Sequence, residues 1–204
     1  GSFRAFWNWG LRVGYVDHTP FKRHDEAVVR LSDKHARSRR LDQDADEETR
    51  LLAACGSHLR AVVEAALETG MRRGEILGLQ WSQVEGLRVE KSGDASVVTW
   101  GARAELVLPW GKTKTKRERR IPISTRLKGI LELRRFDPAG DPLPQSAYVF
   151  GNEIGQRVKD VKRAWMTAVL KAYGHKPTFT KTANLSPESR AALEVIDLHL
   201  HDLR

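Results

Sequence analysis

The feature that most constrains the fold is one apolar stripe, followed at once by a glycine and two arginines. The stripe consists of Leu59, Val62, Val63, Ala66 and Leu67. Its i, i+3, i+4, i+7, i+8 spacing predicts a single buried helix face, and Gly70 predicts the end of that helix. Residues 71–79 are then expected to form a short helix that begins with Arg72 and Arg73 and turns its apolar side chains inward.

The pattern changes between residues 87 and 123 to short runs rich in β-branched and aromatic residues, separated by glycines and charges. The runs are residues 97–100, 104–108 and 120–123. Runs of this kind predict strands, and their close succession predicts a small antiparallel sheet.

Helical spacing also appears outside the central stripe. Asp44 and Glu47 have the spacing of a capping box and predict a helix that starts near residue 44. Further helices are expected at residues 127–135 and from about 158 to 173, and residues 174–187 are expected to be a loop. We therefore predict an α+β fold that is mainly helical with a small antiparallel β-sheet.

The N-terminal part differs from the rest of the chain. Residues 3–15 have the pattern of a short amphipathic helix with an aromatic face that needs a partner. The stretch that follows is dense in Lys, Arg and His and is expected to be a linker, either along a nucleic-acid backbone or as a solvated tether. We expect three parts: residues 1–20, a basic linker at 21–43, and a main domain at 44–204.

Composition favours a polyanionic partner, because 35 Lys and Arg against 26 Asp and Glu give a formal net charge of +9. Charge alone does not identify that partner, since ribosomal proteins, nucleases and membrane-surface proteins are also basic. The single cysteine, Cys55, is expected to be a small buried hydrophobe rather than a catalytic thiol. With no signal peptide and no long apolar run, we expect a soluble, cytoplasmic protein.

Three segments have residues suited to chemistry, and each is weak evidence alone. They are Glu68-Thr69-Gly70-Met71-Arg72-Arg73-Gly74-Glu75-Ile76-Leu77-Gly78-Leu79-Gln80-Trp81, the lysine-rich stretch from Lys112 to Pro122, and His201-Asp202-Leu203-Arg204. In this order they resemble the tyrosine recombinase (phage integrase) family: its first box, its lysine-bearing β-turn and its second box.

The resemblance extends upstream. Trp7-Asn8-Trp9, Gly14-Tyr15-Val16 and Thr19-Pro20-Phe21 are similar to the last helix of the family's core-binding domain and the linker after it. Residues 1–20 would then be a remnant of that domain, and residues 44–204 a catalytic domain of the DNA breaking-rejoining fold.

The chemistry of this family explains the two arginines. Transesterification of a DNA strand builds negative charge on a five-coordinate phosphate, and planar guanidinium groups can clamp it with paired hydrogen bonds. The resemblance implies that Arg72 and Arg204 hold the non-bridging oxygens of the scissile phosphate. The alternative for both is ordinary surface ion pairing.

The lysine-rich stretch is expected to supply the proton that the departing 5′-oxygen needs. Lys114 is the preferred donor, and Lys112 and Lys116 remain alternatives. Arg117 and Arg119 are expected to bind DNA with them. The competing interpretation is that all these lysines only contact phosphate.

His201 precedes Arg204 by three residues, so on a helix both side chains share one face. This spacing favours a hydrogen-bonding or general-base role for His201, and His199 is the alternative histidine outside the spacing. Glu75 follows Arg72 by one helical turn and is expected to brace the arginines rather than carry a proton.

The family's nucleophilic tyrosine follows its second box, and none follows it here. Tyr15, Tyr148 and Tyr173 all come earlier, and none is expected to attack phosphate; Tyr148 is expected in a strand-like core segment. We therefore expect a C-terminally truncated domain with exposed apolar surface, which binds double-stranded DNA but cannot cleave it. The full-length parent would assemble as a tetramer on paired sites, without a membrane.

Two other functions are compatible with parts of the sequence. A decayed integrase could serve as a non-catalytic DNA-binding regulator or recombination accessory protein. A metal-dependent nuclease is disfavoured, because the carboxylates are scattered and the remaining histidines lack metal-ligand spacing. We expect no metal and no cofactor.

Overall fold

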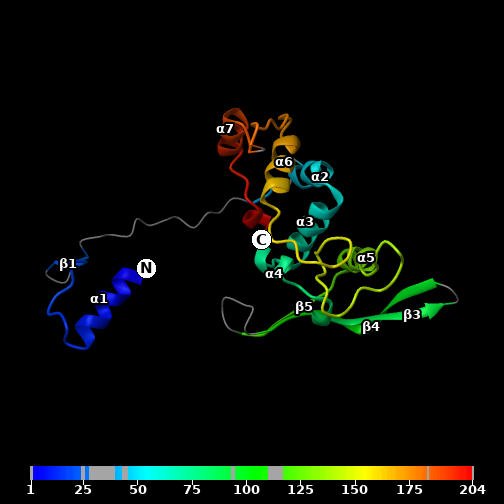
Figure 1. Ribbon diagram of the computed structural model, residues 1–204, viewed down its shortest axis with the longest axis horizontal. Helices are drawn as coiled ribbons and strands as arrows, with labels where there is room; N and C mark the ends of the chain where they lie inside the picture. Colours follow the sequence, from blue (N-terminus) through cyan, green and yellow to red (C-terminus); the bar gives the residue numbers. More distant parts are fainter. Residues whose placement is uncertain are drawn as a thin grey trace. The chain divides into compact units, whose positions relative to one another are not determined.

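The computed structural model describes residues 2–23, 26–27, 40–42, 46–92, 95–109, 117–182 and 184–203. It divides the chain into two compact units, residues 1–38 and 39–204 (Figure 1). In the first unit, helix α1 (Ser2–Arg12) is followed by the two-residue antiparallel strands β1 (Lys22–Arg23) and β2 (Glu26–Ala27). The predicted aromatic helix is confirmed, and within this unit the side chains of Phe3 and Phe6 are largely exposed.

The second unit consists of helices and one three-stranded sheet. In chain order its elements are α2 (Glu47–Ala54), α3 (Ser57–Thr69), α4 (Arg73–Leu77), η1 (Trp81–Gln83), β3 (Val84–Ser92), β4 (Ala95–Leu108), β5 (Arg119–Pro122), α5 (Thr125–Arg134), α6 (Lys162–Ala172), α7 (Pro187–Ile196) and η3 (Leu200–Leu203), the η elements being 3-10 helices. The predicted α+β fold, mainly helical with a small antiparallel sheet, is confirmed.

The apolar stripe of α3 forms the centre of the hydrophobic core. Leu59, Val62, Val63 and Ala66 are all buried, as the helical spacing predicts. The helix ends where predicted, because Gly70 takes the left-handed conformation with φ +60° and its N–H donates to the carbonyl of Ala66 at 2.9 Å.

The sheet has the order β3-β4-β5 and is antiparallel throughout. Two of the predicted runs, 97–100 and 104–108, belong to one long strand, β4. The register shifts between Glu85 and Leu87 of β3, where residues 101–104 of β4 lie opposite the single residue Gly86. Gly86 has φ +82°, and a Cβ there would lie 2.1 Å from the carbonyl oxygen of Arg103. Only glycine allows the two backbones to approach so closely.

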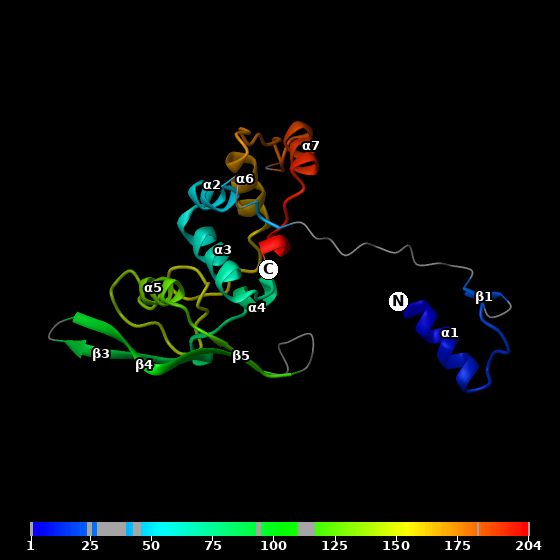
Figure 2. The same ribbon diagram turned by 180° about the vertical axis from the view of Figure 1, so that it is seen from behind.

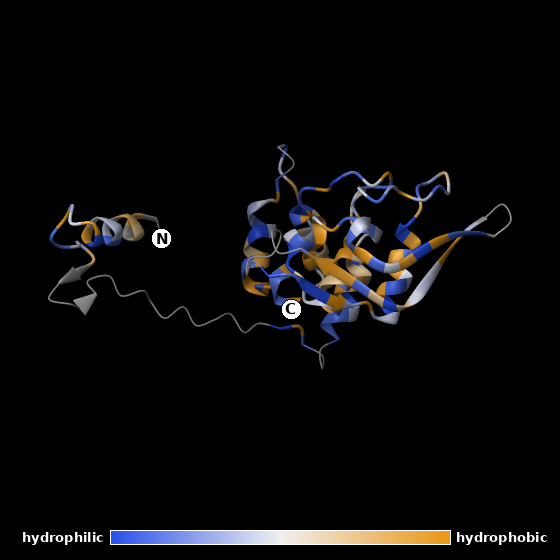
Figure 3. Ribbon diagram, turned by 90° about the horizontal axis from the view of Figure 1, so that it is seen from below, coloured by the Kyte–Doolittle hydropathy of each residue, from blue (hydrophilic) through white to orange (hydrophobic). Residues whose placement is uncertain are grey.

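Figures 1 and 2 show the sheet along one edge of this unit, with α3 running away from it toward α2 and α6. Hydrophobic residues gather between the helices and the sheet (Figure 3). The short helix η3 packs against α3, and Leu198 and Leu203 are buried in the same core. The C-terminal segment is thereby brought beside α4.

Several boundaries differ from prediction. Helix α2 begins at Glu47, and Asp44 lies outside the described residues. Asp46 takes a left-handed conformation before the helix, and the Glu47 carboxylate accepts the backbone N–H of Asp42 at 2.6 Å. Helix α6 begins at Lys162, later than predicted; just before it the Asp160 carboxylate accepts the Lys162 N–H at 3.0 Å in a local turn.

Two segments differ from prediction in kind. Tyr148 does not lie in a strand: it forms an isolated bridge with Gln80, although the residues that follow it are buried in the core. Helix α7 forms where a loop and an unassigned segment were expected. Two residues mark the start of this helix. The Ser186 hydroxyl accepts the N–H of Ser189 at 3.2 Å, and Pro187 occupies the first helical position.

Candidate phosphate-binding site

Arg72 lies in the turn between α3 and α4. Its backbone is extended, with φ −71° and ψ 149°, because the helix that was expected to include it begins one residue later. The preceding residue, Met71, is buried and anchors the turn in the core. The Arg72 side chain is 37% exposed, so part of its guanidinium faces solvent.

Glu75 holds Arg72 through two contacts. One carboxylate oxygen, Oε2, accepts the backbone N–H of Arg72 at 2.9 Å, and the other, Oε1, accepts its Nη1 at 3.1 Å. The Glu75 side chain is only 5% exposed. We call this contact the Glu75 brace, because the carboxylate accepts hydrogen bonds from both the backbone and the guanidinium of one residue.

Arg119 forms an ion pair with the same carboxylate. Its Nη2 lies 3.6 Å from Oε2 of Glu75. Because side chains alternate along a strand, the next residue of β5, Arg120, points elsewhere and pairs with Glu85, Glu105 and Glu118. These carboxylates raise the pKa of Arg120, chiefly through the hydrogen bond that Arg120 donates to Glu85.

The lysine-rich hairpin is mostly outside the described residues. That applies to Lys112, Lys114 and Lys116. Arg117 is described and exposed. Strands β4 and β5, which precede and follow this stretch in the sequence, pair with each other.

His201 lies on η3, and its side chain is exposed beside the buried Asp202 and Leu203. The Asp202 carboxylate accepts the backbone N–H of His199 at 2.7 Å, which closes the turn before His201. Arg204 lies outside the described residues, so its predicted pairing with His201 stays a prediction. His199 is exposed, and its Nε2 is 3.3 Å from Oδ1 of Asp197.

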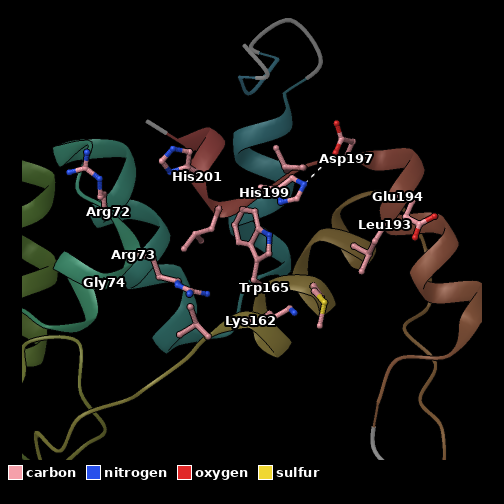
Figure 4. A pocket seen from close by; sticks show the side chains of 14 residues that line it. Arg72, Arg73, Gly74, Lys162, Trp165, Leu193, Glu194, Asp197, His199 and His201 are labelled. Atoms are coloured by element: carbon pink, nitrogen blue, oxygen red, sulfur yellow. Dashed lines mark hydrogen bonds and ion pairs between the residues drawn. The ribbon is translucent and has the colours of Figure 1, made fainter. Parts of the chain in front are cut away.

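A cavity of about 720 Å³ joins these elements (Figure 4). Arg72 and His201 both line it, although they are far apart in the sequence. Figure 4 shows Trp165 of α6 in the middle of the lining side chains, with Arg72 and His201 on the side of α4 and η3. Its apolar lining residues come from α6 and the residue before it, from α7, from η3 and from the segment between α7 and η3.

Several residues of this cavity escaped prediction from the sequence. Arg73 and Lys162 add positive charge to its lining, and Arg73 also pairs with Asp160 at 3.1 Å. Trp165 is marked in the sequence only by its helical spacing. The contact between Arg119 and Glu75 has no signal in the sequence, because the two residues come from a strand and a helix that pair only in the folded chain.

The three tyrosines lie elsewhere. Tyr15 belongs to the first unit, and the Tyr173 hydroxyl donates to the Glu47 carboxylate between α6 and α2. Tyr148 lines a separate cavity of about 250 Å³ with Glu75. Among the described residues that line the larger cavity with Arg72 and His201, none is a tyrosine.

The described residues contain neither a cluster of metal ligands nor a membrane-spanning helix. No group of three or more His, Cys, Asp or Glu side chains is arranged there to hold a metal ion. In the same part of the chain, every helix is too short or too polar to cross a lipid bilayer.

Comparison with known proteins agrees with the order of the motifs. The sequence model of the phage integrase family matches residues 42–204. Neither the search of curated proteins nor the search of solved structures found a match. Since the matched region covers most of the chain and includes both arginine boxes, the chain belongs to the phage integrase family, the tyrosine recombinases of DNA integration and recombination.

Proposed function

We propose that this chain binds double-stranded DNA and holds a backbone phosphate between Arg72, His201 and Arg204. The observation that supports this most directly is the common cavity, which Arg72 and His201 line from distant parts of the sequence. Arg72 is braced by a buried carboxylate and keeps part of its guanidinium in solvent. A rigid, partly exposed guanidinium is suited to a phosphate, because little reorganisation is needed when the anion binds.

In the parent recombinase, the proposed chemistry is transesterification through a 3′-phosphotyrosine. The tyrosine oxygen attacks phosphorus, and the bond from phosphorus to the 5′-oxygen breaks. His201 accepts the tyrosine proton, and Lys114, with Lys112 and Lys116 as alternatives, donates a proton to the 5′-oxygen. Arg72 and Arg204 neutralise the charge that builds on the non-bridging oxygens. As the resemblance implies, the parent would act as a tetramer on paired sites.

Residues 1–204 are expected to bind DNA without cleaving it, because none of their tyrosines lines the cavity with Arg72 and His201. The test is incubation with duplex DNA, followed by denaturing electrophoresis. We expect no covalent protein–DNA adduct. A band that survives denaturation and maps to Tyr15, Tyr148 or Tyr173 would contradict this part of the proposal.

The experiment that tests phosphate binding compares the chain with an Arg72→Ala, Arg204→Ala double variant on a short duplex across a salt series. Because charge-assisted hydrogen bonds to phosphate are strong, we expect affinity to fall at least about 10-fold. The slope of log affinity against log salt should fall by about 1, as for the loss of one phosphate contact.

The matched control is the Arg120→Ala, Arg126→Ala double variant, which loses the same charge. Both guanidiniums are already paired with carboxylates, Arg126 with Glu48, Glu64 and Glu68. We expect its affinity to stay within about 3-fold of the unmodified chain. Equal losses in the two double variants would mean that only net charge binds DNA, and the phosphate clamp would be abandoned.

A further inference from the structure

Arg119 occupies an unusual position for a residue of a DNA-binding hairpin. It begins β5, opposite Leu108 of β4. Its side chain is 37% exposed, yet Nε and Nη2 are both shielded from solvent and have no hydrogen-bond partner within the described part of the chain. The covered edge of the guanidinium therefore cannot reach a DNA phosphate in this conformation.

The shielded edge faces Glu75. Nη2 lies 3.6 Å from Oε2, the oxygen that also accepts the backbone N–H of Arg72. The other oxygen, Oε1, accepts Nη1 of Arg72. One buried carboxylate thus lies between two guanidiniums, and both of its oxygens are in use.

The charges of this group have a consequence for phosphate binding. Arg72 and Glu75 alone would form a neutral pair, in which the carboxylate cancels the charge that a phosphate needs. With Arg119 the three formal charges add up to a net positive charge, and the field at the exposed part of Arg72 favours an anion. The effect is strong in a partly buried site, because solvent screens it less than on the surface.

We propose that Arg119 is a positioning residue, which acts on the phosphate through Glu75 and Arg72 rather than by contacting DNA. It holds the far side of the Glu75 carboxylate and keeps the group positively charged. The inference deepens the proposed function and rests on it, because it assigns Arg119 a role in the Arg72 clamp. It replaces the expectation that Arg119 binds DNA directly.

A double-mutant cycle tests the proposal. Arg119→Gln is measured for duplex binding in the unmodified chain and in an Arg72→Gln background, at one salt concentration. We expect about a 10-fold loss of affinity in the unmodified chain, typical of a lost charge-assisted contact. In the Arg72→Gln background the same change should alter affinity less than about 2-fold. Equal losses in both backgrounds would overturn the proposal.

Arg120→Gln is the matched control, since Arg120 is the next residue of the same strand and carries the same charge. It is expected to change affinity by less than about 3-fold in either background. Arg119→Lys keeps a cation beside Glu75 and is expected to recover most of the affinity. It also replaces Arg119→Gln in the test if the glutamine variant does not fold. A folded lysine variant as weak as Arg119→Gln would contradict the role of net charge.

A measurement without DNA separates this inference from the proposed function. Hydrogen exchange at the backbone N–H of Arg72, which donates to Oε2 of Glu75, can be followed by NMR in the free chain. Arg119→Gln should accelerate that exchange several-fold, because the Glu75 brace loosens, whereas Arg120→Gln should leave it unchanged. Unchanged exchange in Arg119→Gln would overturn the positioning role even if DNA binding is found. Accelerated exchange without any DNA binding would support the brace and refute the proposed function.

Discussion

The backbone N–H of His199 donates to the carboxylate of Asp202 at 2.7 Å, and this bond closes the turn that presents His201. Asp202 is buried, with a relative exposure of 6%. It thus has a local role, although the sequence singled out only its neighbours His201 and Arg204.

We predict that Asp202→Ala lowers the free energy of unfolding by about 1–2 kcal/mol, because it leaves a turn N–H without its buried acceptor. Duplex affinity should fall with it, as His201 loses its fixed position. Asp202→Asn keeps an acceptor oxygen and should cost less. Urea unfolding and duplex titration check both. Asp197→Asn is the control, because it removes the charge of an exposed carboxylate before the same turn and keeps a side chain that tolerates the left-handed backbone at that position, φ 50°. An equal loss there would refute the capping role.

The Glu75 brace leads to a second prediction. Glu75→Gln leaves two guanidiniums beside each other without their common carboxylate. We expect it to lower the free energy of unfolding by about 1–2 kcal/mol. This is less than for a fully buried ion pair, because both arginines are partly exposed. Glu85→Gln removes an exposed partner of Arg120 and should change stability by no more than about 0.5 kcal/mol. Thermal unfolding of the two variants shows whether the buried carboxylate contributes more to stability than the exposed one. Equal losses of stability would contradict the prediction.

Gly86 provides a third prediction, on the sheet. Gly86→Ala should destabilise the chain by more than about 1 kcal/mol, because φ is +82° and the new Cβ would meet the Arg103 carbonyl. Gly101→Ala is the control on the facing strand, since its Cβ would lie 3.7 Å from the nearest backbone atom, an ordinary contact. If chemical denaturation finds the two variants equally stable, the register shift does not need glycine.

Cys55 allows a prediction of pH dependence. Burial raises the pKa of its thiol from about 9 to about 11, so at pH 8 the native thiolate fraction is roughly 100-fold below that of the unfolded chain. Because Cys55 is the only cysteine, alkylation with iodoacetamide reports on it alone. The native rate should keep rising up to about pH 11, whereas in urea it should level off near pH 9. A native midpoint at or below pH 9 would contradict the effect of burial.

The sign of the effect on stability follows from the same pKa. The folded state keeps its proton at a pH where the unfolded state has lost it, so the contribution of Cys55 to stability is complete below about pH 9. That contribution is lost as pH rises toward about 11. In a Cys55→Ala variant, the free energy of unfolding should therefore fall less between about pH 9 and pH 11 than in the unmodified chain.

The sequence predicted the elements with the strongest periodicity. Helix α3 was placed within two residues, because its stripe is continuous and Gly70 ends it. The sheet was predicted, but the continuity of β4 was not, because it depends on a register shift in which residues 101–104 of β4 face the single residue Gly86 of β3. Helix α7 was missed because its apolar residues stand in two runs, 191–193 and 195–196, rather than at the spacing of one buried helix face, and Ser189 alone of its residues is buried.

In the site, the motifs identified individual residues but not the contacts between them. Arg72 and His201 were identified by the order of motifs; both line one cavity, and their roles stay predictions. The pairing of Arg119 with Glu75 depends on the register of β5 against β4 and on where α4 lies, and neither leaves a local pattern in the sequence. Lys114 and Arg204 stay predictions, since they lie outside the described residues.

The packing of η3 against α3 also bears on how this chain is made. A ribosome that adds about 5–20 residues per second needs on the order of ten seconds to go from α3 to η3. For that interval the apolar stripe of the nascent α3 lacks the leucines that finally cover part of it. Long-range contacts of this kind fold slowly and leave hydrophobic surface open to chaperones or to other nascent chains. His201 therefore takes its place only after all the elements between α3 and η3 have been synthesised.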